Sequence, residues 1–304
     1  MKHLFIINPV AGKGKALEYI PKIKDFFSRR QDDMYFIETT EKPGHAVDLV
    51  KQYVSKDTYR VYSVGGDGTL NEVLNGIAGS DSSLAVIPAG SGNDFVKSLV
   101  NYSPLYLSQK DEAKSVLLEK LAHGQEKLAD IGRINDRYFI NISSIGFDAE
   151  VVYNTNRIKK LPLVTGIFAY ILGVFSTLIS YSKNILRISI DNNSIETDTL
   201  LVAVANGRYY GGGMQPAPAA SIYDGIFDIC LIKGVGRLRI LKFFPKFIKG
   251  RHSDVKEVSF HRSKQVKIYS NHKVALNVDG EVSMVDGEID FEIIPGGIKV
   301  VIPG

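Results

Sequence analysis

Three glycine-rich turns, each directly after a short apolar run, constrain the fold of this chain more than any other feature of its sequence. The apolar runs are typical of buried strands, and amphipathic patterns between them are typical of helices. In chain order the predicted elements are strand 4–8, helix 16–27, strand 35–39, helix 44–54, strand 61–64, helix 70–77 and strand 84–88. Strands that alternate with helices predict a parallel α/β sheet, so the glycine turns should lie along one edge of it.

The middle turn carries the strongest local signal for ligand binding. It places Gly65, Gly66 and Gly68 before Thr69, at the predicted start of a helix. Backbone N–H groups and the helix dipole at such a position favour a phosphate group, and glycines let the backbone approach it closely. The alternative is an ordinary turn in which Thr69 caps the helix and Glu72 completes a capping box. A tight turn needs fewer glycines, so we favour phosphate binding.

The other two turns are weak signals when each is taken alone. Residues 8–15 lack the spacing of a P-loop, and the third glycine of a dinucleotide-binding fingerprint is missing. Residues 88–94 hold Gly90 and Gly92 beside Asp94. Three glycine turns at successive strand ends together predict a nucleotide site.

The second half of the chain is rich in predicted strands. Hairpins are predicted at residues 127–134 with 137–142 and at 186–190 with 194–199, and further strands at 201–205, 227–232, 257–260, 266–269, 274–278 and 289–294. Helices are predicted at 110–121, after Pro162 and at 237–249. We therefore place a domain boundary near residue 125.

The net charge of +4 is unevenly distributed. Residues 233–267 hold eleven Lys and Arg against Asp254 and Glu257, a net charge of +9, so the rest of the chain carries −5. Four apolar side chains lie among these cations: Phe243, Phe244, Phe247 and Ile248. Cations beside aromatics suit an anionic membrane surface. Nucleic acid is a rival partner, and a solvated helix face with ordinary strands is the alternative to both.

An uncharged stretch covers residues 161–182, long enough for a helix to cross a bilayer. Its Gly, Ser, Thr and Pro content argues for a buried or membrane-surface helix instead. The average composition excludes a disordered, collagen-like or multi-span membrane protein. The single cysteine, Cys230, cannot form an internal disulfide, and the first residues are no signal peptide, so a cytoplasmic protein is expected.

Two carboxylate turns in the second half have two interpretations. Asp224 precedes Gly225, and Asp279 and Glu281 flank Gly280. Such sequences are most often hairpin turns, but they also suit a general base or a metal site completed across a domain cleft. The residues alone leave this choice open.

In their order along the chain, these motifs resemble the catalytic domain of soluble diacylglycerol kinases and related bacterial lipid kinases, a group related to sphingosine kinases and more remotely to NAD kinases. The first half contributes Asn8-Pro9 with Gly12, Thr40, Gly65-Gly66-Asp67-Gly68-Thr69 with Asn71 and Glu72, and Pro88, Gly90, Ser91, Asn93, Asp94 and Phe95. The second half contributes Gly146-Phe147-Asp148, Asn206 with Gly211-Gly212-Gly213, residues 216–225 and Asp279-Gly280-Glu281. The resemblance covers nearly the whole chain.

The resemblance implies an ATP-dependent lipid kinase of two domains with the active site between them. A Rossmann-like, NAD kinase-like nucleotide-binding domain would cover residues 1–125, and a β-rich, sandwich-like lipid-substrate domain residues 126–295. The last strand, 296–304, would return to the first domain. The reaction transfers the γ-phosphoryl group of ATP to a lipid hydroxyl, with diacylglycerol as the expected acceptor and phosphatidic acid as the product.

The resemblance also assigns roles to residues. The nucleotide-binding set is Asn8, Pro9, Gly12, Thr40, Gly65, Gly66, Asp67, Gly68, Thr69, Asn71, Glu72, Gly90, Ser91 and Asn93. Asp67, Asp94 and Asp224 match a Mg²⁺-linked carboxylate network, with the backbone carbonyls of Ser221 and Ile226 completing the site near Asp224. Glu281, assisted by Asp279, matches the base that accepts the proton of the lipid hydroxyl. Ser91 departs from the Thr that is usual in the family but keeps its hydroxyl.

Several alternatives stay open at this point. Another lipid alcohol or NAD could be the acceptor, or the chain could be a nucleotide- or lipid-binding regulator without activity. The expected partners are ATP, a membrane lipid and an anionic membrane surface that the protein visits peripherally, and no nucleic acid. The oligomeric state is undetermined, although the family includes homodimers.

Overall fold

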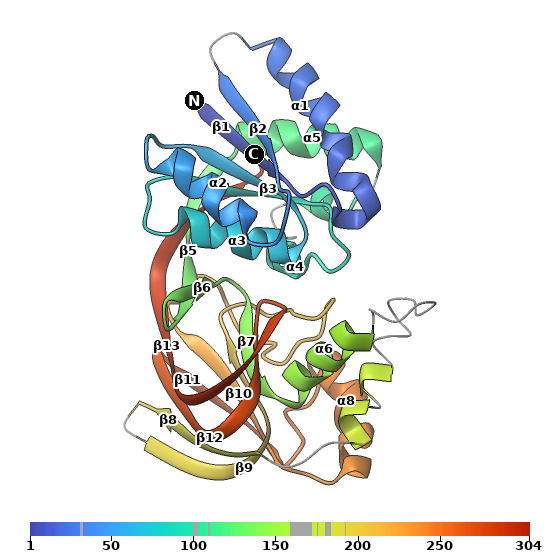
Figure 1. Ribbon diagram of the computed structural model, residues 1–304, viewed down its shortest axis with the longest axis vertical. Coiled ribbons are helices and arrows are strands. Elements are labelled where there is room, and N and C mark those ends of the chain that lie inside the picture. The colour runs from blue at the N-terminus through green and yellow to red at the C-terminus, as the bar shows by residue number, and fades with distance from the viewer. Residues whose placement is uncertain are drawn as a thin grey trace.

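The protein has two lobes, and the first is a parallel sheet covered by helices (Figure 1). The computed structural model describes residues 1–30, 33–99, 103–108, 110–158, 172–174, 176–179, 184–191 and 193–304. In the first lobe the strand order is β4-β3-β1-β2, with β1 at Lys2–Ile7, β2 at Met34–Thr39, β3 at Arg60–Gly65 and β4 at Ser83–Pro88. Every residue of β3 and β4 is buried, as expected for a parallel sheet with both faces covered.

The helices of the first lobe lie close to their predicted places. They are η1 (Ala11–Glu18), α1 (Tyr19–Ser28), α2 (His45–Val54), α3 (Asp67–Ile77), α4 (Asp94–Leu99), η2 (Pro104–Leu107) and α5 (Asp111–Ala122). The predicted helix 16–27 covers the end of the 3-10 helix η1 and most of α1, and only α1 is an α-helix. The short helix α4 was not predicted, since its first residues fall within the third glycine turn.

The second lobe is built mainly from antiparallel strands that curve around a core of their own. Its elements are β5 (Gln125–Ile134), β6 (Arg137–Phe139), β7 (Ile142–Gly146), α6 (Phe147–Ile158), β8 (Asn184–Ile190), β9 (Asn193–Ala205), β10 (Phe227–Lys233), α8 (Arg237–Ile248), β11 (Val258–Ser263), β12 (Gln265–Val278) and β13 (Glu281–Ile302). Because β8 pairs with both β9 and β12, the sheet folds back on itself. Phe139 stacks on Phe227 in this core and meets Phe291 edge to face.

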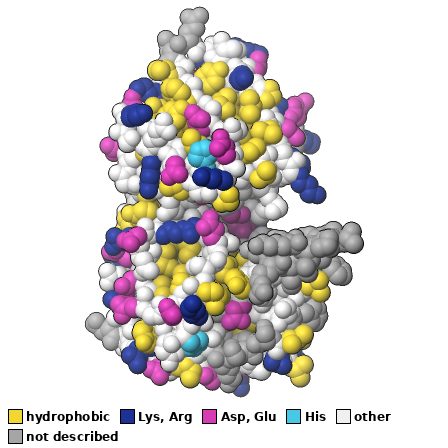
Figure 2. Space-filling view, viewed as in Figure 1, with side chains coloured by type: hydrophobic (Ala, Val, Ile, Leu, Met, Phe, Trp, Pro, Cys, Tyr) yellow, Lys and Arg dark blue, Asp and Glu magenta, His cyan; other side chains and the backbone are white. Residues whose placement is uncertain are grey.

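One long strand joins the two lobes. The first half of β13 pairs with β12 in the second lobe, and its end pairs with β5 and runs parallel to β4 in the first. Lys299 lies opposite Ser83 and Val300 opposite Leu84, so the strand order continues from β12 through β13 to β4. The carboxyl terminus therefore lies in the first lobe, near the amino terminus (Figure 1). The surface narrows between the lobes (Figure 2).

The predicted fold class is confirmed, an α/β lobe followed by a β-rich one, while the strands are longer than the sequence suggested. Predicted strands 194–199 and 201–205 are one strand, β9, and 266–269 and 274–278 are one strand, β12. In β12 the register shifts between Ser270 and Val274, which divides the apolar pattern into two runs. Helix α6 was not predicted.

The uncharged stretch at residues 161–182, with the predicted helix after Pro162, lies largely outside the described residues. Its described parts, 172–174 and 176–179, are helical. Among the described residues, no helix is both long enough and apolar enough to cross a membrane.

Arg60, at the start of β3, ties the sheet to the end of α5. Its guanidinium is buried and donates to the carbonyl oxygens of Leu121 (2.8 Å), Ala122 (2.7 Å) and Gly124 (3.0 Å). These carbonyls belong to the last turn of a helix and the residues after it, where no intrahelical donor is available.

We expect Arg60→Met to lower the free energy of unfolding by about 3 kcal/mol, because buried carbonyls lose a charged donor. Denaturant unfolding measures this loss. Arg29→Met is the control, since Arg29 pairs with Asp25 in solvent and should cost less than about 0.5 kcal/mol. Equal losses in the two variants would contradict this role for Arg60.

Candidate active site

The three glycine turns meet at the carboxyl ends of β1, β3 and β4. A Cβ atom on Gly90 would lie 2.4 Å from the Cα of Gly66, and one on Gly12 would lie 2.1 Å from the carbonyl oxygen of Ala89. The carbonyl oxygen of Gly65 accepts from the amides of Ala89 (2.7 Å) and Gly90 (3.0 Å). Glycine is therefore required at these contacts, and the backbones form one continuous surface.

Side chains fix the first turn to the second. The amide group of Asn8 donates to the hydroxyl of Thr69 (3.0 Å), and its oxygen accepts from the amide of Val10 (3.1 Å). Pro9 lies half-buried between them. Gly66 is the N-cap of α3, so Thr69 is the third residue of the helix, and the alternative in which Thr69 begins a capping box is wrong. The first amides of α3 have no intrahelical acceptor and remain suited to an anion.

The other nucleotide-set residues surround this surface. Glu72 accepts from the amides of Gly44 (2.9 Å) and Ala46 (3.1 Å) and thus caps α2. Thr40 follows β2 and donates its amide to Ile7 in β1. The remaining members lie in the turns themselves: Gly68 and Ser91 are exposed, and the Asn93 side chain closes its turn with two hydrogen bonds to Gly90.

Two carboxylates are coupled beneath the turns. Asp67 accepts from the amide of Asp94 (2.6 Å). Burial, with a smaller contribution from the charge of Asp94, raises the pKa of Asp67 to about 6. Asp94 accepts from the Lys97 ammonium (2.6 Å) and from the amide of Gly212 (2.8 Å). Because Gly212 belongs to the second lobe, Asp94 joins the nucleotide turns to the opposite side of the site.

The three carboxylates of the predicted Mg²⁺ network do not form one cluster, since the described residues contain no group of three or more acidic, His or Cys side chains suited to a metal. Asp224 is ion-paired with Arg262. Asp130 supports the adjoining loop: it accepts from the amides of Gly225 (2.7 Å) and Gly296 (2.8 Å). The close pair Asp67 and Asp94 is the carboxylate set that a divalent cation would suit, since a cation there would favour the charged form of Asp67, whose pKa burial raises.

Asp279 is a structural link between the lobes. Its buried carboxylate accepts from the amides of Ile140 (2.8 Å), Asn141 (3.0 Å) and Ile142 (3.1 Å) and from the side chain of Asn71 on α3 (3.0 Å). Burial raises the pKa of Asp279, and these four donors act against the rise. Asp279 and Gly280 both have positive φ, so this segment is also the hairpin turn between β12 and β13.

Glu281 has a different environment. Its side chain is 45 % exposed and pairs with Arg137 (2.6 Å), and the same nitrogen of Arg137 donates to Asn71 (2.7 Å). Glu281 is thus held at the rim between the lobes with part of its carboxylate open. Of the two predicted catalytic carboxylates, Asp279 is enclosed by donors and Glu281 is accessible.

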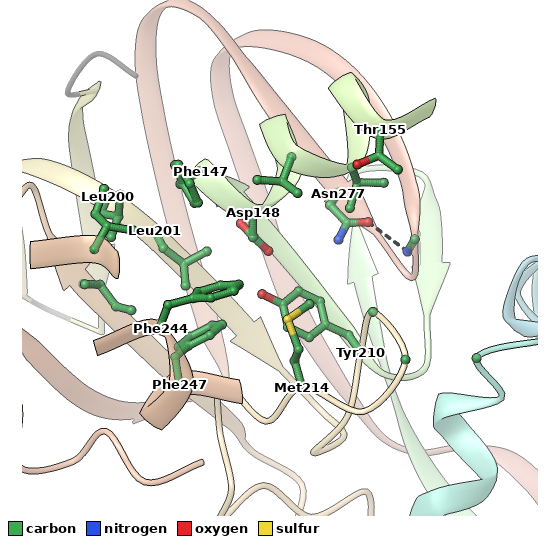
Figure 3. Close-up of a pocket in the computed structure, with 18 of the residues that line it drawn as sticks. Phe147, Asp148, Thr155, Leu200, Leu201, Tyr210, Met214, Phe244, Phe247 and Asn277 are labelled. Carbon is green, nitrogen blue, oxygen red and sulfur yellow. Dashed lines mark hydrogen bonds between the residues drawn. The ribbon is translucent and has the colours of Figure 1, made fainter. Parts of the chain in front are cut away.

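An apolar cavity of about 300 Å³ begins beside these turns. Its walls come from α6, α8, β9 and β10 (Figure 3), with Phe147, Val151, Leu201, Ile240, Phe243 and Phe247 among the lining residues. Ser91 and Gly92 of the third glycine turn and Gly280, next to Glu281, also line it. The space therefore connects the glycine turns with an apolar interior.

Sequence reasoning assigned no role to four polar residues of this region: Lys97, Asp130, Arg137 and Asp148. The i,i+3 spacing of Asp94 and Lys97 on a short helix was a usable signal. Asp130 and Arg137 contact partners that are far away in the sequence. Asp148 bonds to Ser144, four residues before it, but the cavity that it lines is built from distant elements.

The comparisons with known proteins agree with this architecture. Residues 2–134 match the model of the diacylglycerol kinase catalytic domain, and residues 141–302 match that of the YegS C-terminal NAD kinase beta sandwich-like domain. A diacylglycerol kinase of Bacillus subtilis is 29% identical over 301 residues, covering 98% of this chain and 95% of the relative. A diacylglycerol kinase of Staphylococcus carnosus is 30% identical over 280 residues, covering 91% and 87%.

The fold is also similar to a crystal structure of a diacylglycerol kinase from Bacillus anthracis. The TM-score is 0.70 at 24% sequence identity, and the match covers 100% of this chain and 97% of the other. At this identity the likeness shows the fold.

We expect Asp279→Asn to lower the free energy of unfolding by about 3 kcal/mol, because the new NH₂ group would face backbone N–H donors. Hydrogen exchange at the amides of residues 140–142 should accelerate. Glu281→Gln is the matched control and should change stability by less than about 1 kcal/mol, since the pair with Arg137 is exposed. An Asp279→Asn protein of unchanged stability would contradict the linking role.

Proposed function

The chain belongs to the diacylglycerol kinase family, and we propose that it transfers the γ-phosphoryl group of ATP to the hydroxyl of diacylglycerol, giving phosphatidic acid. The observation that carries this proposal is the apolar cavity beside the glycine turns. Ser91 and Gly92 border it on the nucleotide side and Gly280 on the side of Glu281. An acyl chain in the cavity would leave the glycerol hydroxyl at this opening, between the phosphate site and a carboxylate.

We place ATP on the first lobe, with its phosphates against the turns at residues 65–69 and 90–93. The backbone contact between Gly66 and Gly90 and the amino end of α3 favour anionic oxygens there. Asn8, Pro9, Gly12, Thr40, Asn71 and Glu72 shape or support this surface through the contacts described above. With this assignment, the proposed nucleotide-binding domain covers residues 1–125, to which residues 296–304 return, and the proposed lipid-substrate domain covers residues 126–295.

Glu281 is the proposed general base. It is exposed, at the rim, and oriented by Arg137, whereas the oxygens of Asp279 accept four hydrogen bonds. Asp279 then acts as a positioning residue that fixes the turn carrying Glu281. Lys97 beside Asp94 adds positive charge near the phosphates, which suits a reaction that depends mainly on positioning and charge neutralisation.

Mg²⁺ is the implied cation, and Asp67 with Asp94 would hold it together with the ATP phosphates, where it would neutralise charge on the transferred group. From the family resemblance we also propose a second Mg²⁺ site, at Asp224 with the backbone carbonyls of Ser221 and Ile226. There, Arg262 already balances the charge of Asp224.

Helix α8 is the proposed contact with an anionic membrane. Ile240, Phe243 and Phe247 face inward and line the cavity, while Leu238 is 83% exposed and Leu241 45%. The exposed cations Lys242, Lys249 and Arg251 lie on or directly after the same helix. Exposed apolar side chains next to cations favour an anionic lipid surface. Binding of α8 there would bring the wall of the cavity to the membrane.

The cavity also bears on the other interpretations. NAD is a polar acceptor and has no group that would fill an apolar space of this size, so NAD phosphorylation is disfavoured. A regulator without activity needs no accessible carboxylate beside the nucleotide turns. Phosphorylation of NAD but of no lipid would establish the first alternative, and ATP binding without turnover on any lipid the second.

We expect Glu281→Gln to lower kcat for lipid phosphorylation by about 10²- to 10⁴-fold, because the hydroxyl would lose its proton acceptor. Transfer of radiolabelled phosphate from ATP to diacylglycerol in mixed micelles measures this, and calorimetry should show nearly unchanged ATP affinity. Glu288→Gln is the control and should keep full activity, because Glu288 lies on the same strand as Glu281 but is exposed and pairs with Lys267. Full activity of Glu281→Gln would remove this residue from the mechanism.

We expect the double substitution Leu238→Glu, Leu241→Glu to weaken binding to vesicles that contain phosphatidylglycerol by roughly tenfold or more. Vesicle sedimentation measures binding, and activity should fall on vesicle-embedded diacylglycerol but not on a water-dispersed short-chain one. Leu107→Glu, at an exposed leucine of the first lobe, is the control. Loss of binding in the control alone would place the membrane contact elsewhere.

A further inference from the structure

A single charged side chain, Asp148, interrupts the apolar wall of the cavity among its described lining residues. Asp148 is in the first turn of α6, between Phe147 and the residues of α6 that face the cavity. Its carboxyl lies beside the rings of Tyr210 and Phe244 (Figure 3). A carboxyl among aromatic and aliphatic groups is costly unless it is hydrogen-bonded, so its position calls for a partner.

The protein supplies only part of this hydrogen bonding. Oδ2 of Asp148 accepts from the Ser144 hydroxyl (2.5 Å). Oδ1 is shielded from water and makes no hydrogen bond of normal geometry within the described part of the chain. Burial raises the pKa of Asp148, and the hydroxyls of Ser144 and Tyr210 act against this rise. The side chain nevertheless remains partly accessible where it lines the cavity.

A series of contacts connects Asp148 to the proposed catalytic turn. The side-chain amide of Asn277 lies 3.5 Å from the Ser144 hydroxyl, and its oxygen accepts from the amide of Gly280 (2.8 Å). Gly280 precedes Glu281. Asn277 and Gly280 line the same cavity as Asp148, so a lipid head group at the opening would meet both the carboxyl and the turn.

We propose that Asp148 selects the acceptor lipid by donating a hydrogen bond from its carboxyl to an ester carbonyl oxygen of the lipid, while the acyl chain fills the cavity. This proposal rests on the proposed function and adds a specificity-determining residue to it. Burial favours the protonated form of this carboxyl, which is a hydrogen-bond donor, and an ester offers only acceptors. A lipid whose ester is replaced by an ether lacks the carbonyl and leaves the carboxyl without its partner.

The test compares a diester with a diether acceptor. In mixed micelles, kcat/KM of the wild-type protein should be about tenfold higher for dioctanoylglycerol than for dioctylglycerol, as expected for one buried hydrogen bond. Asp148→Ala should reduce the ratio to about one, mainly by raising KM for the diester. Asp148→Asn keeps a donor in the same shape and should retain most of the preference. Asp148→Asn also keeps the proposal testable if Asp148→Ala does not fold.

Glu150→Gln is the matched control. Glu150 lies on the same helix and is partly buried, but it is not among the lining residues, so the ratio should not change. A wild-type ratio near one, or equal losses for the two lipids in Asp148→Ala, would overturn the proposal.

A second measurement separates this inference from the proposed function. Calorimetry with the 3-deoxy analogues of both lipids, which have no hydroxyl to phosphorylate, should show the same ester preference and the same loss in Asp148→Ala. If no lipid is phosphorylated but this binding pattern holds, the kinase assignment fails and the Asp148 site stands. If lipids are phosphorylated and the pattern is absent, only the Asp148 proposal fails.

Discussion

The buried carboxylate of Asp279 is the interaction on which the arrangement of the site depends. It draws together three consecutive amides, at residues 140–142, and the side chain of Asn71 on α3. A carboxylate that accepts several hydrogen bonds compensates for the loss of hydration, but only in one geometry. Asp279 therefore links α3, which carries the proposed phosphate-binding turn, to the β12–β13 hairpin, which carries Glu281, and Arg137 adds a second link through Asn71 and Glu281.

Other buried or half-buried carboxylates of the protein also hold segments in place by accepting hydrogen bonds from backbone amides. Glu72 caps α2, Asp94 reaches Gly212 in the other lobe, and Asp130 holds the amides of Gly225 and Gly296. In each case a carboxylate satisfies backbone amides at a turn that secondary structure leaves unpaired. These acidic residues account for part of the −5 outside residues 233–267, and they organise loops. Asp67 stands apart, because burial beside Asp94 raises its pKa and leaves the pair suited to a cation.

Local patterns predicted the first lobe well, because each of its strands and helices is defined by neighbouring residues. The three glycine turns could be assigned to one edge from the order of elements alone, and the contact of Gly66 with Gly90 agrees. In the second lobe, register shifts in β12 and β13 divided long strands into apparent short ones. Arg137 contacts partners distant in sequence, and Asp148 lines a cavity built from distant elements, so only the folded chain reveals their roles.

The basic stretch at residues 233–267 shows how a charge count changes once partners are known. Arg262 pairs with Asp224, and Lys267 with Glu288 and Asp290, all acidic residues outside the stretch. Within it, Arg239 pairs with Glu257 and Lys246 with Asp254. The three acidic residues from outside the stretch lower the net charge of this region from +9 to +6, while Asp254 and Glu257 are already counted in the +9. What remains distinctive is α8, whose inner face lines an apolar cavity and whose outer face shows exposed leucines beside lysines. The exposed leucines on the outer face of α8 are the feature that supports the proposed contact with a lipid surface, which would also supply the ligand of the cavity.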